Sequence, residues 1–208
     1  NEDPDGYTIG FVPTASMALT PLFVDGANYT VDDFDYICGF GQYGYGIVVN
    51  NDSEFKSMDD VIAAMKKGTL KFGITGYPQP FAMYELANQV GGSVEAVSYP
   101  STTDMITDVM GGFLDICVAD EASFAAYVRS GDVTLLAGCC EDRWISGPDV
   151  PTLLELGYDV KLEAYLAMVA PKGIDADKLA ILRDAFETAA QDKKFIAQPP
   201  VKSFDFSI

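Results

Sequence analysis

Short apolar runs alternate along the chain with stretches in which apolar residues recur every three or four positions. In SMDDVIAAMKKG (57–68), Ser57 and Asp60 have the spacing of a capping box, and apolar residues follow at helical spacing until Gly68. The next run, LKFGI (70–74), has the length and apolar character of a strand. Alternation of this kind predicts parallel sheets covered by helices.

The same pattern assigns an element to most of the chain. Strands are expected over 6–12, 34–40, 46–50, 70–74, 94–98, 114–119, 133–137 and 162–171. Helices are expected over 16–23, 57–68, 80–90, 102–112, 121–131 and 175–192, with a turn and a short helix within 149–158. GQYGY (41–45), rich in glycine and tyrosine, is expected to join two strands, and Pro21 is expected to interrupt the first helix.

Four strand-to-helix junctions are candidates for ligand binding: VPTAS (12–16), ITGYPQP (74–80), SYPSTT (98–103) and VADEAS (118–123). In a parallel sheet such junctions share one edge. None of them contains Lys or Arg, but helix amino ends offer unpaired N–H groups and a partial positive charge that can bind an anion. Ordinary capping by Ser and Thr explains any single junction. The first three junctions, rich in hydroxyl groups, together favour a ligand site.

The chain is acidic and has enough apolar residues for a substantial core. Its 208 residues are 49% hydrophobic and carry a formal net charge of -18. Nucleic-acid binding, which needs clustered Lys and Arg, is therefore not expected. An anionic ligand would approach against the overall field, so attraction has to be local. The chain shows no secretory signal and no initiating Met, and Asn1 is expected to be a processed or trimmed end.

The sequence contains no histidine, which removes Ser-His-Asp and Cys-His catalysis and imidazole metal sites. The four cysteines, Cys38, Cys117, Cys139 and Cys140, form no C-x-x-C pair, so their disulfide state stays open and zinc is not expected. Adjacent carboxylates such as Asp120-Glu121 could perform acid–base chemistry, but such pairs arise by chance among 31 acidic residues. We therefore expect no catalytic residues, no metal and no cofactor.

Three segments have a familiar order and spacing: PDGYT (4–8), DVMGGFLDI (108–116) and PDVPTLLELGY (148–158). Together with the intervening sequence, they resemble the substrate-binding (Bug) receptors of tripartite tricarboxylate transporters, from about residue 4 to 194. The resemblance implies an α/β, two-lobed periplasmic-binding-protein fold (Venus flytrap, type II), each lobe a mostly parallel sheet flanked by helices. Lobe 1 would comprise 1–48 and 167–208, and lobe 2 would comprise 49–166.

The resemblance also implies a function. A Bug receptor captures a small organic acid, a di- or tricarboxylate or a related carboxylate, outside the cytoplasm and delivers it to membrane transporter subunits. The receptor would be periplasmic or lipid-anchored at the cell surface. The family normally has a further strand and a Gly-rich loop ahead of PDGYT, so lobe 1 is expected to be incomplete at its amino end. The alternatives are an effector domain of a regulator, although no DNA-binding helix-turn-helix segment is present, and an enzyme on this fold.

Family loops that hold carboxylates match the junctions. Tyr99 and Asp120 match family residues, whereas Pro100 replaces a usual Lys and Tyr77 is bulkier than the family pattern, which leaves the acid's identity open. Tyr43 is added because the family's chain crosses between lobes beside it. The expected ligand-binding residues are Thr14, Ala15, Ser16, Tyr43, Thr75, Gly76, Tyr77, Gln79, Tyr99, Ser101, Thr102 and Asp120.

Overall fold

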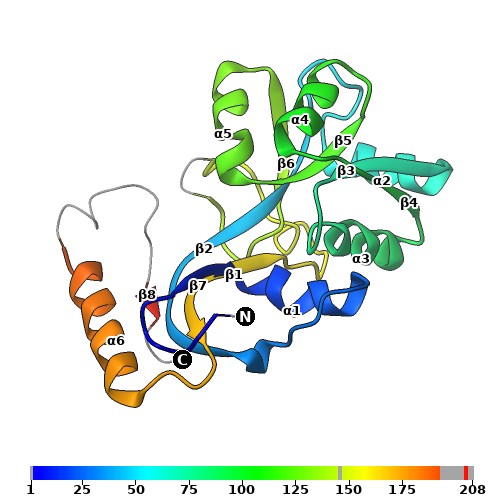
Figure 1. Ribbon diagram of the computed structural model, residues 1–208. Coiled ribbons are helices and arrows are strands. Elements are labelled where there is room, and N and C mark those ends of the chain that lie inside the picture. Colours follow the sequence, from blue (N-terminus) through cyan, green and yellow to red (C-terminus); the bar gives the residue numbers. More distant parts are fainter. Residues whose placement is uncertain (1, 145–146, 193–203, 206–208) are drawn as a thin grey trace. The chain divides into compact units, whose positions relative to one another are not determined.

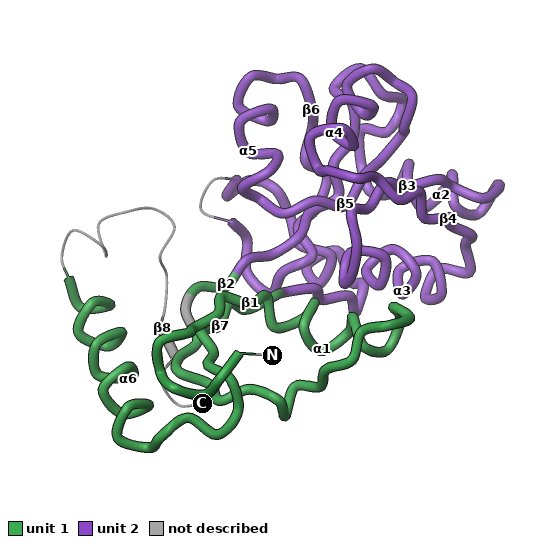
Figure 2. The backbone as a smooth tube through the Cα atoms, viewed as in Figure 1, with its two compact units in different colours: residues 1–42, 164–208 green, residues 43–163 purple. Residues whose placement is uncertain are grey.

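The computed structural model describes residues 2–144, 147–192 and 204–205 (Figure 1). The chain divides into two compact units, which we treat separately (Figure 2). Unit 1 comprises residues 1–42 and 164–208, and unit 2 comprises residues 43–163. We predicted two ligand-binding lobes, 1–48 with 167–208 and 49–166. That these ranges act as ligand-binding lobes stays a prediction.

Most expected elements are present, with ends shifted by a few residues. The helices are α1 (Thr14–Phe23), α2 (Met58–Lys67), α3 (Pro80–Val90), α4 (Thr102–Met110), α5 (Glu121–Ser130) and α6 (Ala176–Ala190), with the 3-10 turn η1 (Val31–Asp33). The strands are β1 (Gly10–Pro13), β2 (Phe34–Asn50), β3 (Thr69–Ile74), β4 (Ser93–Ser98), β5 (Ile116–Asp120), β6 (Val133–Gly138), β7 (Glu163–Pro171) and β8 (Phe204–Asp205). Within the described ranges, no helix is both long and apolar enough to cross a bilayer.

Unit 2 is built on a mixed sheet with the strand order β6-β2-β5-β3-β4. β3 runs parallel to β4 and β5, whereas β2 runs antiparallel to β5 and β6. Helices lie on both faces: the ring of Phe72 in β3 meets Tyr84 of α3, and the next residue, Gly73, lies against Met105 of α4. This arrangement brings the carboxyl ends of β5, β3 and β4 to one edge.

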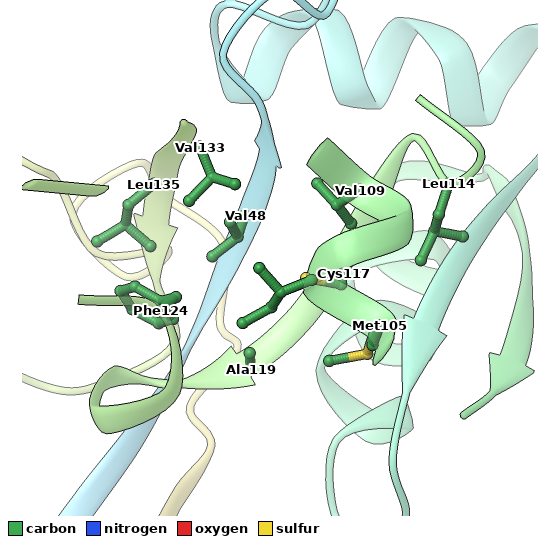
Figure 3. Packing of buried hydrophobic residues seen from close by; sticks show 10 residues of the cluster. Val48, Met105, Val109, Leu114, Cys117, Ala119, Phe124, Val133 and Leu135 are labelled. Atoms are coloured by element: carbon green, nitrogen blue, oxygen red, sulfur yellow. The ribbon is translucent and has the colours of Figure 1, made fainter. Parts of the chain in front are cut away.

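The core between α4, α5 and the sheet fixes the positions of these junctions. Val48, Cys117 and Ala119 of the sheet are fully buried, and they face Met105 of α4 and Phe124 of α5 (Figure 3). Apolar burial of this kind stabilises by roughly 25 cal/mol per Å² of area removed from water. This packed core therefore fixes the positions of the first residues of α4 and α5 at the sheet edge.

Unit 1 is smaller and its strands pair differently. β1 pairs antiparallel with β7, β7 neighbours β2, and β2 pairs antiparallel with β8. Helix α6 packs its partly buried Leu179, Leu182 and Phe186 against Ile37 and Cys38 of β2. Burial of one helical face in this way is typical of an amphipathic helix on a sheet.

The structure corrects several expectations. GQYGY is not a loop, because β2 runs unbroken from Phe34 to Asn50. The segment 149–158 forms turns and a single bridge from Thr152 to Gly138 instead of a helix. Helix α1 continues across Pro21. The sheets are also less parallel than expected: among the strand pairs whose register is described, β3–β4 and β3–β5 are parallel, whereas β1–β7, β2–β5, β2–β6 and β2–β8 are antiparallel.

Candidate ligand-binding site

Three of the four candidate junctions meet at one edge of the unit 2 sheet. They follow β3, β4 and β5, which are adjacent and parallel, so the loops after Ile74, Ser98 and Ala119 leave the sheet on the same side. Tyr99 N–H donates to the carbonyl of Ile74 at 2.8 Å, which ties two of these junctions directly. The fourth junction, with Thr14, Ala15 and Ser16, belongs to unit 1.

The loop after β3 is closed by Gln79. Its Oε1 accepts hydrogen bonds from Thr75 N–H at 2.7 Å, Gly76 N–H at 3.0 Å and the Thr75 hydroxyl at 3.1 Å. Gln79 itself is only 4% exposed. The ring of Tyr77 contacts Phe81 of α3, with centroids 5.9 Å apart. The polar donors expected to meet a ligand are therefore already engaged by a neighbouring side chain.

The loop after β4 begins α4, and its two hydroxyl residues differ. Ser101 caps the helix, accepting from Asp104 N–H at 3.1 Å and donating to Asp104 Oδ2 at 2.7 Å. Thr102 is half-buried, and its hydroxyl has no hydrogen-bond partner within the described part of the chain. Ser101 is thus committed to capping, whereas the Thr102 hydroxyl is available to a ligand.

Tyr99 is held by the adjacent helix. Its hydroxyl donates to Oδ2 of Asp108 at 2.9 Å, and its ring packs against the core beneath α4. Burial, followed by the bond to Asp108, raises the pKa of the Tyr99 hydroxyl. Asp108 was not among the expected residues. Asp108 lies nine residues after Tyr99, beyond a loop and about two turns of α4. No local spacing rule predicts a contact between residues so placed.

Asp120 ends β5 and caps α5. Its carboxylate accepts from Ser123 N–H at 3.1 Å and from the Ser123 hydroxyl at 2.7 Å. Across the β2–β5 ladder it lies opposite Tyr45, whose hydroxyl donates to that of Tyr43 at 3.3 Å. Burial raises the pKa of Tyr45, helped by the bond to Tyr43 and the nearby charge of Asp120. Tyr45 thus lies beside two of the expected residues, bonding Tyr43 and standing opposite Asp120.

In unit 1, the start of α1 lacks a side-chain cap. Pro13 occupies the N-cap position and no acidic residue stands in the first turn. The Thr14 hydroxyl donates to the carbonyl of Tyr165 at 3.0 Å, while Thr14, Ala15 and Ser16 are half-buried. The start of α3 is likewise uncapped by a side chain. Sequence alone does not distinguish these two helix starts from the capped starts of α4 and α5.

Metal binding and thiol chemistry have little support in the structure. The described residues contain no group of three or more His, Cys, Asp or Glu placed to hold a metal ion. None of the four cysteines forms a disulfide, and all four are buried. Burial raises the pKa of the Cys117 thiol to about 12, and it also raises the pKa of Cys38 and Cys139. A buried neutral thiol is a poor nucleophile and a poor metal ligand.

A groove of about 510 Å³ lies elsewhere in unit 2, between α3 and residues 159–162. Its lining includes Tyr84, Glu85 and Lys161, and none of the expected ligand-binding residues. Neighbouring Gln89 bridges its rim by bonding both backbone polar groups of Asp159.

The sequence matches the family model described as "Tripartite tricarboxylate transporter family receptor" over residues 1–205. The chain belongs to this receptor family. It is 34% identical over 191 residues to a UPF0065 protein from the gbd 5' region of Cupriavidus necator, covering 89% of this chain and 58% of that protein. It is 26% identical to protein BugT of Bordetella pertussis, and the match covers 92% of this chain and 61% of BugT. This member of the receptor family therefore spans less than two thirds of these relatives.

Solved structures confirm the fold of this family member. BugD, a periplasmic binding protein, superposes with a TM-score of 0.80 at 20% identity, covering 94% of this chain and 67% of that one. A Rhodopseudomonas palustris protein solved with adipate superposes with a TM-score of 0.83 at 17% identity, covering 94% of this chain and 67% of that one. MatC from the same organism, solved with malate, superposes with a TM-score of 0.78 at 17% identity, covering 93% of this chain and 68% of MatC. The predicted family and the periplasmic-binding-protein fold are thus both confirmed.

Proposed function

We propose that the protein is an extracytoplasmic solute-binding receptor that captures a small organic carboxylate for the membrane subunits of a tripartite tricarboxylate transporter. The observation that carries the proposal is the polar sheet edge of unit 2, where three junctions without a cationic side chain meet in a member of this receptor family. The acid is a dicarboxylate, a tricarboxylate or a related compound.

The chemistry of the junctions supports an anionic ligand. In unit 2, the start of α3 has no side-chain cap and offers the partial positive charge of a helix amino end, and the Thr102 hydroxyl has no hydrogen-bond partner among the described residues. Hydrogen bonds to a charged group contribute about 1.5–3 kcal/mol each, so a few of them support micromolar binding. Such short-range attraction is compatible with a net charge of -18, since it does not depend on the overall field.

The related structures support the same ligand class. Two proteins with this fold were solved with malate and adipate, both dicarboxylates. The fold alone does not fix the ligand. The family match adds the transporter context and an extracytoplasmic location to the proposal.

Binding without turnover is the activity that the residues support. The chain has no histidine, and its cysteine thiols are buried. The carboxylate of Asp120, the most prominent acid at the sheet edge, is engaged as the cap of α5.

A thermal-shift panel tests the proposal. Succinate, malate, adipate and citrate are compared with their neutral amides, using the protein at its natural length. At a hundredfold excess over Kd, a ligand stabilises the folded state by about 2.7 kcal/mol, so at least one acid should raise the melting temperature and its amide should not. Equal shifts by acids and amides, or no shift by any acid, would contradict carboxylate capture.

Two further readouts separate the alternatives. Mass spectrometry of the acid after incubation should recover it unchanged, whereas an enzyme would convert it. Uptake of the labelled acid by cells carrying the transporter subunits should require the protein, whereas a regulator's effector domain would leave uptake unaffected.

A further inference from the structure

We propose that Gln79 is a fixed hydrogen-bond donor that determines which ligand groups the loop after β3 accepts. Its side-chain oxygen is locked inside the loop, so that only its Nε2 amide group can meet a ligand. This inference rests on the proposed function and adds to it a specificity-determining role for one residue.

The lock is a cluster of three donors around one atom. Thr75 N–H, Gly76 N–H and the Thr75 hydroxyl lie 2.7, 3.0 and 3.1 Å from Oε1 of Gln79. Two backbone N–H groups and a hydroxyl converging in this way are the set of contacts that a carboxylate oxygen would receive. The Gln79 oxygen therefore fills an anion-binding nest from within the chain.

The donors also fix the orientation of the amide. All three can donate to an oxygen, and the two N–H groups cannot accept from an amide nitrogen, so Oε1 must face the loop. Because the carboxamide is planar, Nε2 then faces away from Thr75 and Gly76. Nε2 has no hydrogen-bond partner in the described part of the chain, although the side chain is 4% exposed. Nε2 is not fully enclosed, so solvent can reach it.

This geometry has a consequence for the ligand. A fixed N–H₂ group donates and cannot accept, so it favours a carboxylate, carbonyl or hydroxyl oxygen and disfavours an amine. The amide groups of Thr75 and Gly76 are not available unless Gln79 moves. The loop thus contributes one side-chain donor in place of several backbone donors.

Ligand-free stability tests the lock. In Gln79→Glu, one carboxylate oxygen takes the place of Oε1, and its charge lies at the start of α3, where a helix favours an anion. Its melting temperature should equal or exceed that of the wild type. Gln79→Met has similar length but leaves the three donors without their acceptor, and its melting temperature should fall by several degrees. Wild-type stability in Gln79→Met would overturn the lock.

Binding of malate and adipate by calorimetry tests the donor. Gln79→Glu places a negative oxygen where Nε2 was, so the affinity for the acid bound by the wild type should fall at least a hundredfold. Asn88→Asp on the exposed part of α3 adds the same charge and should change affinity less than threefold. In proton–nitrogen spectra, the side-chain amide pair missing from Gln79→Glu should shift when the acid is added to the wild type.

The outcomes separate this inference from the proposed function. Wild-type affinity in Gln79→Glu would overturn the donor role while leaving carboxylate capture intact. A wild-type protein that binds neither acid would overturn the donor role together with the choice of ligand, whereas the lock would still stand or fall on the ligand-free melting temperatures.

Discussion

At the residue scale, the difficulty is that a helix cap and an anion contact use the same side chains. The capping box at Ser57 and Asp60 was predictable from spacing and is confirmed by reciprocal hydrogen bonds of 2.9 and 3.4 Å. Ser101 and Asp120 were expected at the ligand and instead have clear capping partners. Their assignment as ligand-binding residues stays a prediction, weakened by those partners.

Ser101 and Thr102 provide a matched pair for separating the two roles. Ser101→Ala removes a cap and should lower the free energy of unfolding by about 1 kcal/mol, with little change in acid affinity. Thr102→Ala removes a hydroxyl without a described partner, so stability should change by less than about 0.5 kcal/mol while affinity falls several-fold. Urea unfolding and calorimetry on both variants measure this. Reversed outcomes would make Ser101 the ligand contact and Thr102 a bystander.

Asp35 stabilises unit 1 through its charge. Its carboxylate bonds Lys172 Nζ at 2.8 Å and Gly173 N–H at 2.7 Å at the turn before α6. The bond from Lys172, followed by backbone donors, holds the pKa of Asp35 below its ordinary value of 3.8. A lowered folded-state pKa means that the stabilisation is complete above about pH 3.8 and is lost as pH falls through the folded value.

Asp35→Asn should therefore cost about 1 kcal/mol of unfolding free energy at pH 7, and the difference from the wild type should shrink below about pH 4. Urea unfolding at pH 7, 5 and 3.5 measures it. Asp25→Asn, at an exposed carboxylate, serves as the control and should have little effect at any of these pH values. A constant difference down to pH 3.5 would show that charge is not the cause.

At the element scale, apolar periodicity predicted nearly all helices and strands, since α2 and α4 each bury one face and α5 and α6 pack buried or partly buried apolar residues on their sheets. The periodicity failed to predict β2 as one strand, because the glycines of GQYGY (41–45) are typical of a turn between two strands. There, Gly44 and Gly46 are required by close packing: a side chain at Gly46 would lie 2.5 Å from Leu135 and 2.7 Å from Trp144. Such a long-range contact leaves no trace in the local pattern.

Gly46→Ala should accordingly lower the free energy of unfolding by about 1–3 kcal/mol, the usual cost of overpacking a core. Gly68→Ala is the matched control, since no atom lies within 4 Å of its added Cβ and its backbone is extended. It should change stability by less than about 0.5 kcal/mol. Equal effects of the two substitutions in urea unfolding would contradict the packing account of β2.

At the scale of the whole molecule, the order of motifs predicted the family and fold, both confirmed by the family match and solved relatives. Strand direction was less predictable, because an apolar pattern marks a strand without fixing the direction of its neighbours. Unit 2 unites the junctions after β3, β4 and β5, as expected from a parallel edge. The lock at Gln79 escaped prediction, since Thr75, Gly76 and Gln79 are polar in the same way whether they bind each other or a ligand.

The net charge of -18 gives the most direct test of carboxylate capture. Salt screens the repulsion between an acid and the protein's surface, whereas short-range hydrogen bonds in a partly buried site are screened much less. Calorimetry should compare the best acid of the panel with its amide at low and at moderate salt. We predict saturable micromolar binding of the acid, preserved or slightly improved by salt, and no binding of the amide. Equal binding of the amide, or a steep loss of acid binding with salt, would contradict the account.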